Sequence, residues 1–211
     1  MPVYAMNRAD ITHSETRWWN SPSSFGGIAG LTQLGLIVSY IFCTQYKDTI
    51  QANRSAGGMD SYYPMFQDVH VMIFIGFGFL MTFMHNGSFS ATGHTFFIGA
   101  LILQFAILTN GFWHNVHTGH WNTIDLDITT LIKADFACGA ILITFGALLG
   151  KVSPTQLLLI GVMECGIFSM NEYIGALHFG AVDMGGSIFV HTFGAYFGLA
   201  VAKMLGPATR K

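Results

Sequence analysis

DMGGSIFVHTFGAYFGLAVA, residues 183–202, is one apolar stretch of helix length with a single histidine, His191, inside it. A run this long, with no other ionisable group beyond Asp183 at its start, predicts a transmembrane helix. Asp183 precedes two glycines and a serine, a composition typical of a helix start at which the carboxylate accepts free backbone N–H groups. In a helix regular from that point, His191 would lie about 12 Å further along and on nearly the same side as Asp183. An imidazole at this depth predicts a functional site, because polar groups inside a membrane are unfavourable unless they face a partner or a cavity.

The composition of the whole chain agrees with a membrane protein. Of its 211 residues, 52% are hydrophobic and 9% are charged, well below the roughly 25% charged residues of soluble domains. The apolar runs are continuous rather than alternating, which predicts an all-α membrane protein instead of a β-barrel. A formal net charge of −2 gives no support for nucleic-acid binding. The three cysteines fall inside apolar runs, which favours small core residues over a disulfide framework.

The apolar runs predict six membrane spans, at about 23–46, 65–85, 91–112, 129–149, 155–177 and 183–205. We expect residues 1–21 to form a polar N-terminal arm and residues 22–211 to form one membrane domain. The segment 113–128 is expected to be a loop carrying the pattern H-x2-H-x2-H, with His114, His117 and His120. A helical loop would allow these imidazoles to bind zinc or copper. A solvated loop is the favoured interpretation, and no metal site is predicted.

The basic residues indicate the orientation of the chain in the membrane. With the N-terminus in the cytoplasm, six of the nine Lys and Arg residues lie inside, in the direction of the positive-inside rule. This orientation places the sequon at Asn53 outside, where it is available for glycosylation. Most acidic residues then lie near the outer face, and an acidic rim concentrates cations. The charge distribution therefore points to a cationic or cation-derived solute.

Five separated blocks resemble the Rh glycoproteins, the animal branch of the ammonium transporter superfamily: FQDVHVMIFIGFGFLMTF at 66–83, KADF at 133–136, GALLGKVSPTQLL at 146–158, NEY at 171–173 and the stretch at 183–202. The resemblance implies an extra first helix followed by two inverted five-helix halves. It also implies a homotrimer in the plasma membrane, with one narrow apolar pore in each subunit. The transported solute would be ammonia or ammonium, with methylammonium and carbon dioxide as further candidates.

The same resemblance assigns roles to four residues. His191 resembles the first of the family's two pore histidines, and Phe136 resembles the first of its two stacked gate phenylalanines. Glu172 and Asp183 resemble acidic residues of the outer vestibule that recruit ammonium. The first repeat would cover residues 66–205. The second repeat, with its own histidine and phenylalanine, would lie beyond residue 211, so we expect this chain to correspond to the first half alone, as a piece of a longer product or as a short isoform.

The function expected from the sequence is passive passage of ammonia and ammonium past an acidic mouth, a phenylalanine constriction and an interior histidine. No enzymatic activity and no cofactor are predicted, because no metal triad, activated nucleophile or phosphate-binding loop is apparent. Two alternatives stay open. The chain could be a non-conducting half-subunit or scaffold that assembles with full-length Rh relatives. It could also be a haem-binding helix bundle, since histidines occur in or near several spans.

Four further polar residues inside or near the spans have weaker assignments. Asp68, His70 and Asp135 are expected to be structural, with Asp135 capping or hydrogen-bonding at the outer end of its helix. Glu164 lies in the middle of the fifth predicted span and matches no functional position of the family. We expect it either to face a polar helix interface in protonated form or to mark a feature particular to this protein.

Overall fold

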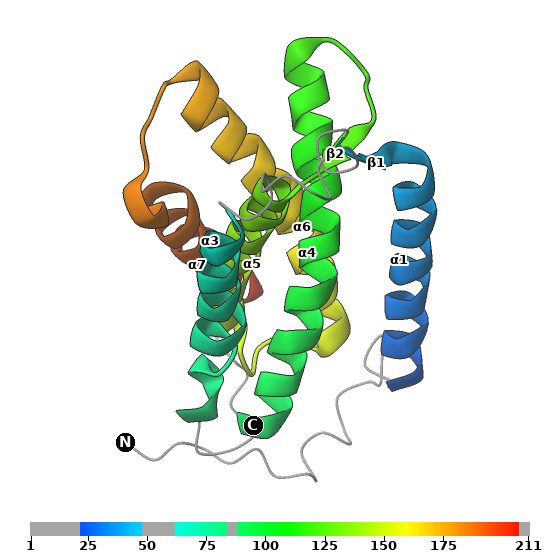
Figure 1. Ribbon diagram of the computed structural model, residues 1–211. Helices are drawn as coiled ribbons and strands as arrows, with labels where there is room; N and C mark the ends of the chain where they lie inside the picture. The colour runs from blue at the N-terminus through cyan, green and yellow to red at the C-terminus, as the bar shows by residue number, and fades with distance from the viewer. Residues whose placement is uncertain (1–21, 48–61, 84–87, 207–211) are drawn as a thin grey trace, which may run out of the picture.

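The computed structural model describes residues 22–47, 62–83 and 88–206. The predicted arm at 1–21 and the sequon at Asn53 lie outside these residues. The described residues form six helical segments that are long and apolar enough to cross a membrane, and Figure 1 shows them assembled as a bundle. An all-α membrane fold with six spans is therefore confirmed.

The regular helices are α1 (Pro22–Cys43), α3 (Tyr63–Val71), α4 (Ser88–Thr118), α5 (Ile128–Leu148), α6 (Pro154–Tyr173) and α7 (Phe193–Leu205). Shorter turns extend three of them: the π-helical turns η3 (Met72–Phe77), η5 (Ile174–His178) and η7 (Ser187–Thr192), and the 3-10 turns η4 (Leu80–Phe83) and η6 (Met184–Gly186). Two three-residue strands, β1 (Thr44–Tyr46) and β2 (Ile124–Leu126), pair in parallel. We call the end of the bundle that carries these strands, at the top of Figure 1, the strand end.

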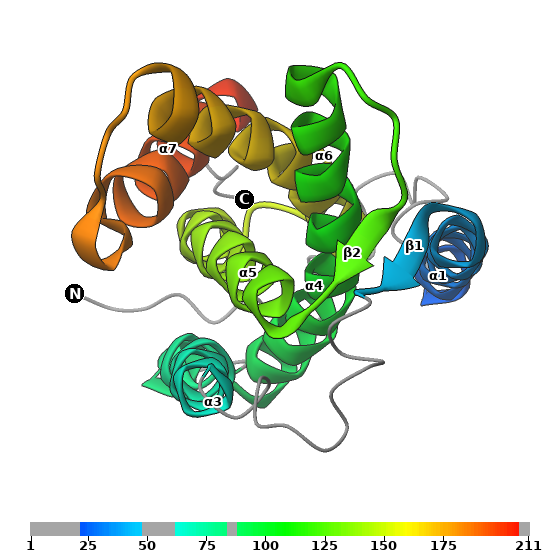
Figure 2. The same cartoon turned by 45° about the horizontal axis from the view of Figure 1, so that its top comes forward.

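Helix α5 lies at the centre of the bundle, surrounded by α3, α4, α6 and α7 (Figure 2). Of the residues in its most apolar stretch, 67% are buried inside the protein, against 22% for the spans that contain α3 and α7. Small residues make this possible, since Ala134, Ala137, Cys138 and Ala140 are all completely buried. In a membrane, where lipid is as apolar as a protein core, such close backbone approach is a main source of helix association.

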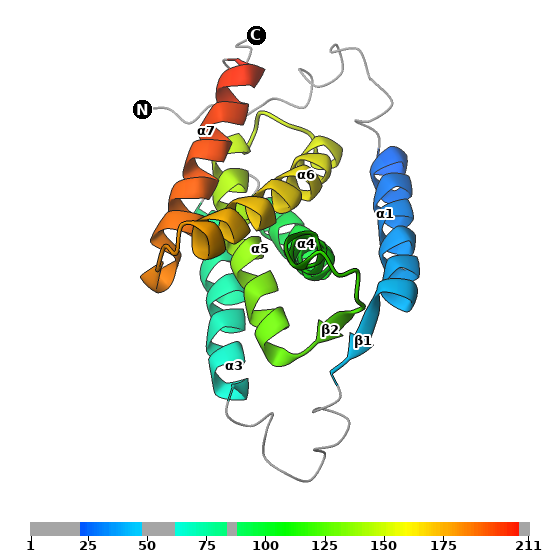
Figure 3. The same cartoon turned by 90° about the horizontal axis from the view of Figure 1, so that it is seen from above.

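Helix α1 stands apart from this centre (Figure 3). Only 11% of the residues in its most apolar stretch are buried, and the helix contacts α4 and α6. The Tyr40 hydroxyl donates a hydrogen bond to the Gln104 carbonyl at 2.8 Å, and the side-chain amide of Gln33 donates to the Gln104 side chain at 2.8 Å. The first helix is therefore joined to the bundle by a few polar contacts and a narrow apolar seam.

The pairing of β1 with β2 adds a second connection between α1 and the bundle. The Lys47 ammonium lies 3.2 Å from Asp127 Oδ2 beside the strands. Asp127 also begins α5, because its Oδ1 accepts the Thr130 backbone N–H at 2.7 Å. Burial alone would raise the pKa of Asp127, but hydrogen bonds from Thr129, Thr130 and Lys47 outweigh it and lower the pKa to about 2. The strand pair was not expected from the sequence.

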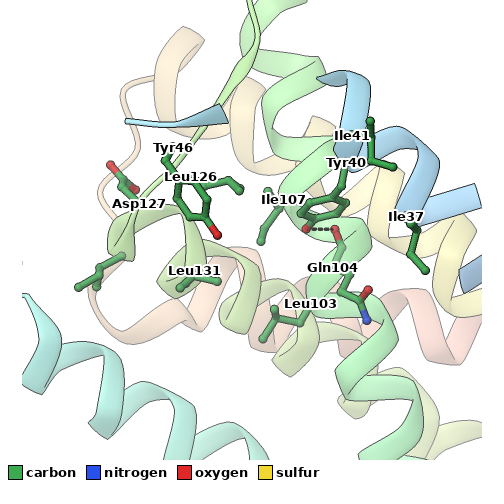
Figure 4. Close-up of a pocket in the computed structure, with 11 residues that line it drawn as sticks. Ile37, Tyr40, Ile41, Tyr46, Leu103, Gln104, Ile107, Leu126, Asp127 and Leu131 are labelled. Carbon is green, nitrogen blue, oxygen red and sulfur yellow. Dashed lines mark hydrogen bonds between the residues drawn. The ribbon is translucent and has the colours of Figure 1, made fainter. Parts of the chain in front are cut away.

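An apolar groove of about 650 Å³ opens between α1, α4, β2 and α5 (Figure 4). Tyr40, Ile41, Ile107 and Leu131 contribute to its walls, and Asp127 lies at one end. None of the four residues with a predicted pore or recruitment role lines it. The groove therefore belongs to the attachment of the first helix and not to the predicted pathway.

Two expectations from the sequence need correction. The segment 113–118 is not a loop, because α4 continues to Thr118. The apolar run ends several residues earlier, but a helix can continue past the membrane once its polar turns reach water. Cys43 is exposed at the end of α1 rather than placed in a core, while Cys138 and Cys165 are buried as expected.

Candidate functional site

The start of the last span confirms the predicted role of Asp183 as a cap. Its Oδ2 accepts the backbone N–H groups of Ile188 at 2.9 Å and Phe189 at 2.8 Å. The helix, however, is not regular from this point. Gly185 and Gly186 adopt φ angles of 78° and 73°, a left-handed conformation that glycine tolerates without strain. These two residues turn the chain so that the carboxylate reaches N–H groups five and six residues ahead.

His191 follows in the π-helical turn η7, and its side chain is exposed. Its Nδ1 lies 3.1 Å from the Gly186 carbonyl oxygen. A carbonyl only accepts, so Nδ1 carries the proton and Nε2 is the ring nitrogen left for a further contact. Single π-helical turns often occur at functional sites. The predicted pore residue is therefore held in one orientation and displayed on an open face of the bundle.

Phe77 faces this histidine and was missed at the level of sequence. Its ring centroid lies 6.1 Å from that of His191, with the planes at 48°. Phe77 ends a second π-helical turn, η3, so two irregular turns from different spans meet here. Among 19 phenylalanines, the one available signal was its position between Gly76 and Gly78 in the block at 66–83.

Phe136, the predicted gate residue, lies half-buried on α5 against the main core. One turn further, a Cβ on Gly139 would lie 3.1 Å from Ile73 Cδ1 and 3.4 Å from Val190 Cγ1. Gly139 is therefore a point where side chains of η3 and η7 both pack against α5. The structure thus gathers the elements carrying Phe136, Phe77 and His191, although among the described ring contacts Phe136 does not touch His191.

The two predicted recruitment residues belong to one charged group. Glu172 is half-buried near the end of α6, and the charges of Lys133 and Asp183 both act on it. Asp183 is already engaged as a cap, because its carboxylate accepts the backbone N–H groups of Ile188 and Phe189 and the Ser187 hydroxyl. A basic residue, Lys133, was not part of the predicted mouth. Its positive charge acts on Glu172 in the opposite sense to the negative charge of Asp183.

Asp135, just before Phe136, makes the structural contact expected of it. Its carboxylate is completely buried, and both oxygens lie 3.1 Å from Nδ1 of His70 on α3. The His70 ring itself lies between Phe66 and Phe74, at centroid distances of 5.1 and 4.5 Å. Asp68, two residues before His70, is exposed. The pair of His70 and Asp135 joins α3 to α5 beside the predicted gate.

Glu164 lies at a buried polar junction of three helices. The Thr144 hydroxyl lies 2.6 Å from Glu164 Oε1 and 2.9 Å from the Gly194 carbonyl. A hydroxyl has a single hydrogen and a carbonyl only accepts, so both contacts form together when the Glu164 carboxyl carries the proton and donates to Thr144. This arrangement matches the first of the two expectations for Glu164, a protonated residue at a helix interface. It ties α6 to α5 and α5 to α7.

Two of the three histidines of the pattern at 114–120 occupy helical positions instead of the expected loop. His114 and His117 lie in the last turns of α4, and His120 follows the helix end. Both helical imidazoles pack against Tyr173, at centroid distances of 6.5 and 5.2 Å. Within the described part of the chain, no group of three or more His, Cys, Asp or Glu residues is arranged to hold a metal ion.

Comparison with known proteins agrees with this helical membrane architecture. A family model described as the Ammonium Transporter Family matches residues 28–211. The chain is 48% identical over 174 residues to the ammonium transporter Rh type B of Danio rerio, covering 81% of the chain and 37% of that relative. It is 52% identical over 143 residues to the protein of that name from Rattus norvegicus (68% and 31%) and 47% identical over 157 residues to that of Homo sapiens (74% and 34%).

These observations define a helical, multi-pass membrane protein that displays a fixed imidazole on one face of its last span. The chain belongs to the Ammonium Transporter Family, which confirms the resemblance inferred from the five sequence blocks. It spans somewhat more than a third of the Danio rerio relative, at 37% of its length. Transport by the whole of such a relative therefore applies to this chain only as a proposal.

Proposed function

We propose that this chain forms one wall of a passive pathway that carries ammonia and ammonium across the membrane. The family and the names of the Rh type B relatives support ammonium as the solute. The assignment of a site depends on one observation, the orientation and exposure of the His191 ring. This ring is oriented by the Gly186 carbonyl, lies beside Phe77 and is exposed instead of packed in the core.

The physical problem is that ammonium is a hydrated cation. Moving a charge to the centre of a bilayer requires about 3 kcal/mol or more, whereas neutral ammonia crosses with little penalty. Glu172 and Asp183 would raise the local ammonium concentration at the mouth by attraction of opposite charge. The ring of Phe136 would narrow the path and hold the cation briefly over its face. The ammonium would then release its proton to water at the mouth, and neutral ammonia would enter the apolar part of the pathway.

His191 would act in the interior of this pathway. Because its Nδ1 is held on a carbonyl, Nε2 of the neutral ring would accept a hydrogen bond from an ammonia N–H. One such contact replaces a hydrogen bond to water without placing a charge in the membrane. The described residues line His191 on one side, through Phe77 and η7. The opposite wall would come from further chain or from another copy.

The test compares two histidines that make the same local contact. His94 also lies in a membrane span and has its Nδ1 2.8 Å from a backbone carbonyl, that of Ser90. Purified chain is reconstituted in liposomes, and the internal pH is followed after an ammonium gradient is imposed. We expect His191→Leu to lower the ammonia-driven pH change at least tenfold and His94→Leu to leave it within twofold. Equal loss in both variants would remove the pore assignment.

The exposure of His191 also supports the second candidate, a half-subunit that does not conduct by itself. In that case the chain alone gives no flux above empty liposomes, and it co-purifies with a full-length Rh type B relative when the two are expressed together. Saturable methylammonium uptake by the chain alone would exclude this second candidate. The mass of the detergent-solubilised complex, corrected for detergent, separates the homotrimer that we propose from a mixed assembly.

The orientation we propose has the N-terminus in the cytoplasm and the strand end outside the cell, in the plasma membrane. Asn53 follows β1 by a few residues, so it would lie on the same side as the strand end and carry a glycan. Protein from animal cells is treated with an amide-cleaving glycosidase and run on a gel. A mobility shift that is lost in Asn53→Gln supports the orientation, and a shift that persists in Asn53→Gln contradicts it.

A further inference from the structure

Two histidines from distant parts of the sequence meet at the strand end. His117 lies in the last turn of α4, and His178 is the last residue of η5. Figure 1 shows that α4 and the extended α6 both reach this end of the bundle. The two ring centroids are 5.0 Å apart, with the planes at 72°. We propose that His117 and His178 form a binding site for a divalent transition metal of the Zn²⁺ or Cu²⁺ type.

The distance between the rings is compatible with coordination of one ion by both imidazoles. For two imidazoles bound through nitrogen at ~2.1 Å, with a tetrahedral angle between the bonds, the ring centroids lie about 5 Å apart. The observed separation of 5.0 Å matches this geometry before any metal is added. Binding would require the two rings to rotate about their side-chain bonds until one nitrogen of each faces the ion.

Both imidazoles are available for such a contact. Each side chain is exposed, and among the hydrogen bonds of the described residues neither ring nitrogen has a partner. Tyr173 packs against His117 at a centroid distance of 5.2 Å, which supports that ring from one side. Imidazole nitrogen is a preferred ligand of zinc and copper. Since no third side-chain ligand is in place among the described residues, water would complete the coordination.

A metal bound here would join α4 to the end of η5. His178 directly precedes the link, residues 179–183, that leads to Asp183 and the last span. The ion would therefore restrict movement of this link relative to α4. This consequence is independent of what the pathway carries, so the site can be tested without any measurement of transport.

The alternative is an ordinary edge-to-face contact between two aromatic rings, which has no need of a metal. Binding measurements separate the two. The whole chain, purified through a tag without histidine that is then removed, is titrated with Cu²⁺ in detergent. Calorimetry gives the affinity, and electron paramagnetic resonance reports nitrogen ligation. We expect nitrogen-coordinated Cu²⁺ in the wild type and at least a tenfold weaker affinity in both His117→Ala and His178→Ala.

The matched control is His120→Ala, which removes the exposed third histidine of the same pattern and should leave the affinity within twofold. A second readout uses Zn²⁺, which should raise the thermal unfolding midpoint of the wild type and of His120→Ala but not of His178→Ala. Unfolding midpoints measured without metal show whether each variant is folded. Wild-type affinity in either His117→Ala or His178→Ala, or an equal loss in His120→Ala, would overturn the proposal.

Discussion

Helices α5 and α7 both follow an aspartate that accepts backbone N–H groups, yet they lie in different surroundings. Asp127 caps α5, which is regular over all its 21 residues. Of the residues in its apolar stretch, 67% are buried. Asp183 caps a segment that passes through a 3-10 turn and a π-helical turn before the regular helix α7 begins. In the apolar stretch of that span, 22% of the residues are buried. The regular helix organises the core, whereas the irregular one displays His191.

In this pair of helices the buried one is regular and the one with an open face is not, although α1 shows that a helix can also be regular with little burial. A helix packed on all sides is stabilised most by its neighbours when every turn has the same spacing, because the neighbouring side chains then pack against a periodic surface. A helix with an open face can contain a wider turn, since lipid or another chain adapts to it. The two helices meet at Gly194 and Gly198, and this contact is where the comparison can be tested most severely.

The largest effect is expected for Gly194→Ala. A Cβ at this position would lie 2.5 Å from the Ala140 carbonyl oxygen, and backbone on both sides prevents an easy adjustment. We expect a loss of about 3 kcal/mol in the free energy of unfolding, measured as a lower thermal midpoint in detergent. Gly166→Ala on α6 is the matched control, because nothing lies within 4 Å of its added Cβ. Equal midpoints for the two variants would show that α5 and α7 do not pack at Gly194.

The next effect concerns the polar junction between the two helices. Thr144→Val keeps the shape of the side chain but removes the hydroxyl that contacts Glu164 and the Gly194 carbonyl. Leaving these buried groups unpaired is expected to destabilise the fold by about 2 kcal/mol. Glu164→Gln should change stability much less, because its amide N–H still donates to Thr144. A larger loss in Glu164→Gln than in Thr144→Val would mean that the carboxyl is not the donor.

A smaller effect is expected at the irregular helix start. Asp183→Ala removes the acceptor of the Ile188 and Phe189 backbone N–H groups. The loss of an N-cap destabilises a helix by about 1 kcal/mol. Asp183→Asn retains an amide oxygen as acceptor and should be closer to the wild type in thermal midpoint. If Asn and Ala behave alike, the carboxylate supports this turn through its charge instead of its hydrogen bonds.

The last effect is expected at the regular helix start and depends on pH. The folded pKa of Asp127 is about 2, below its ordinary value of 3.8. Its ionised form therefore stabilises the fold above pH 4, and this contribution is lost as the pH falls from about 4 to about 2. Asp127→Ala should lack that part of the acid destabilisation. Lys47→Ala should change stability by less than about 1 kcal/mol, since exposed ion pairs contribute little.

Much of the candidate site was predictable because it depends on local sequence. The blocks around His191 and Phe136 identified the family, and the composition at Asp183 predicted its cap. Phe77 was not predictable, since its pairing with His191 joins two segments more than 100 residues apart through two π-helical turns. The histidines at 114–120 were assigned to a loop because hydropathy reports where an apolar run ends and not where hydrogen bonding of the helix stops.

The sequence by itself determined the membrane class, six spans and family membership, because continuous apolar runs and conspicuous motifs are properties of the chain. Only the tertiary structure decided which of these spans is central. Lipid and protein core are equally apolar, so hydropathy cannot distinguish α5 from α1. Close approach at Gly139 and Gly194, the hydrogen bond between Glu164 and Thr144, and the position of His191 beside Phe77 all arise from contacts between spans.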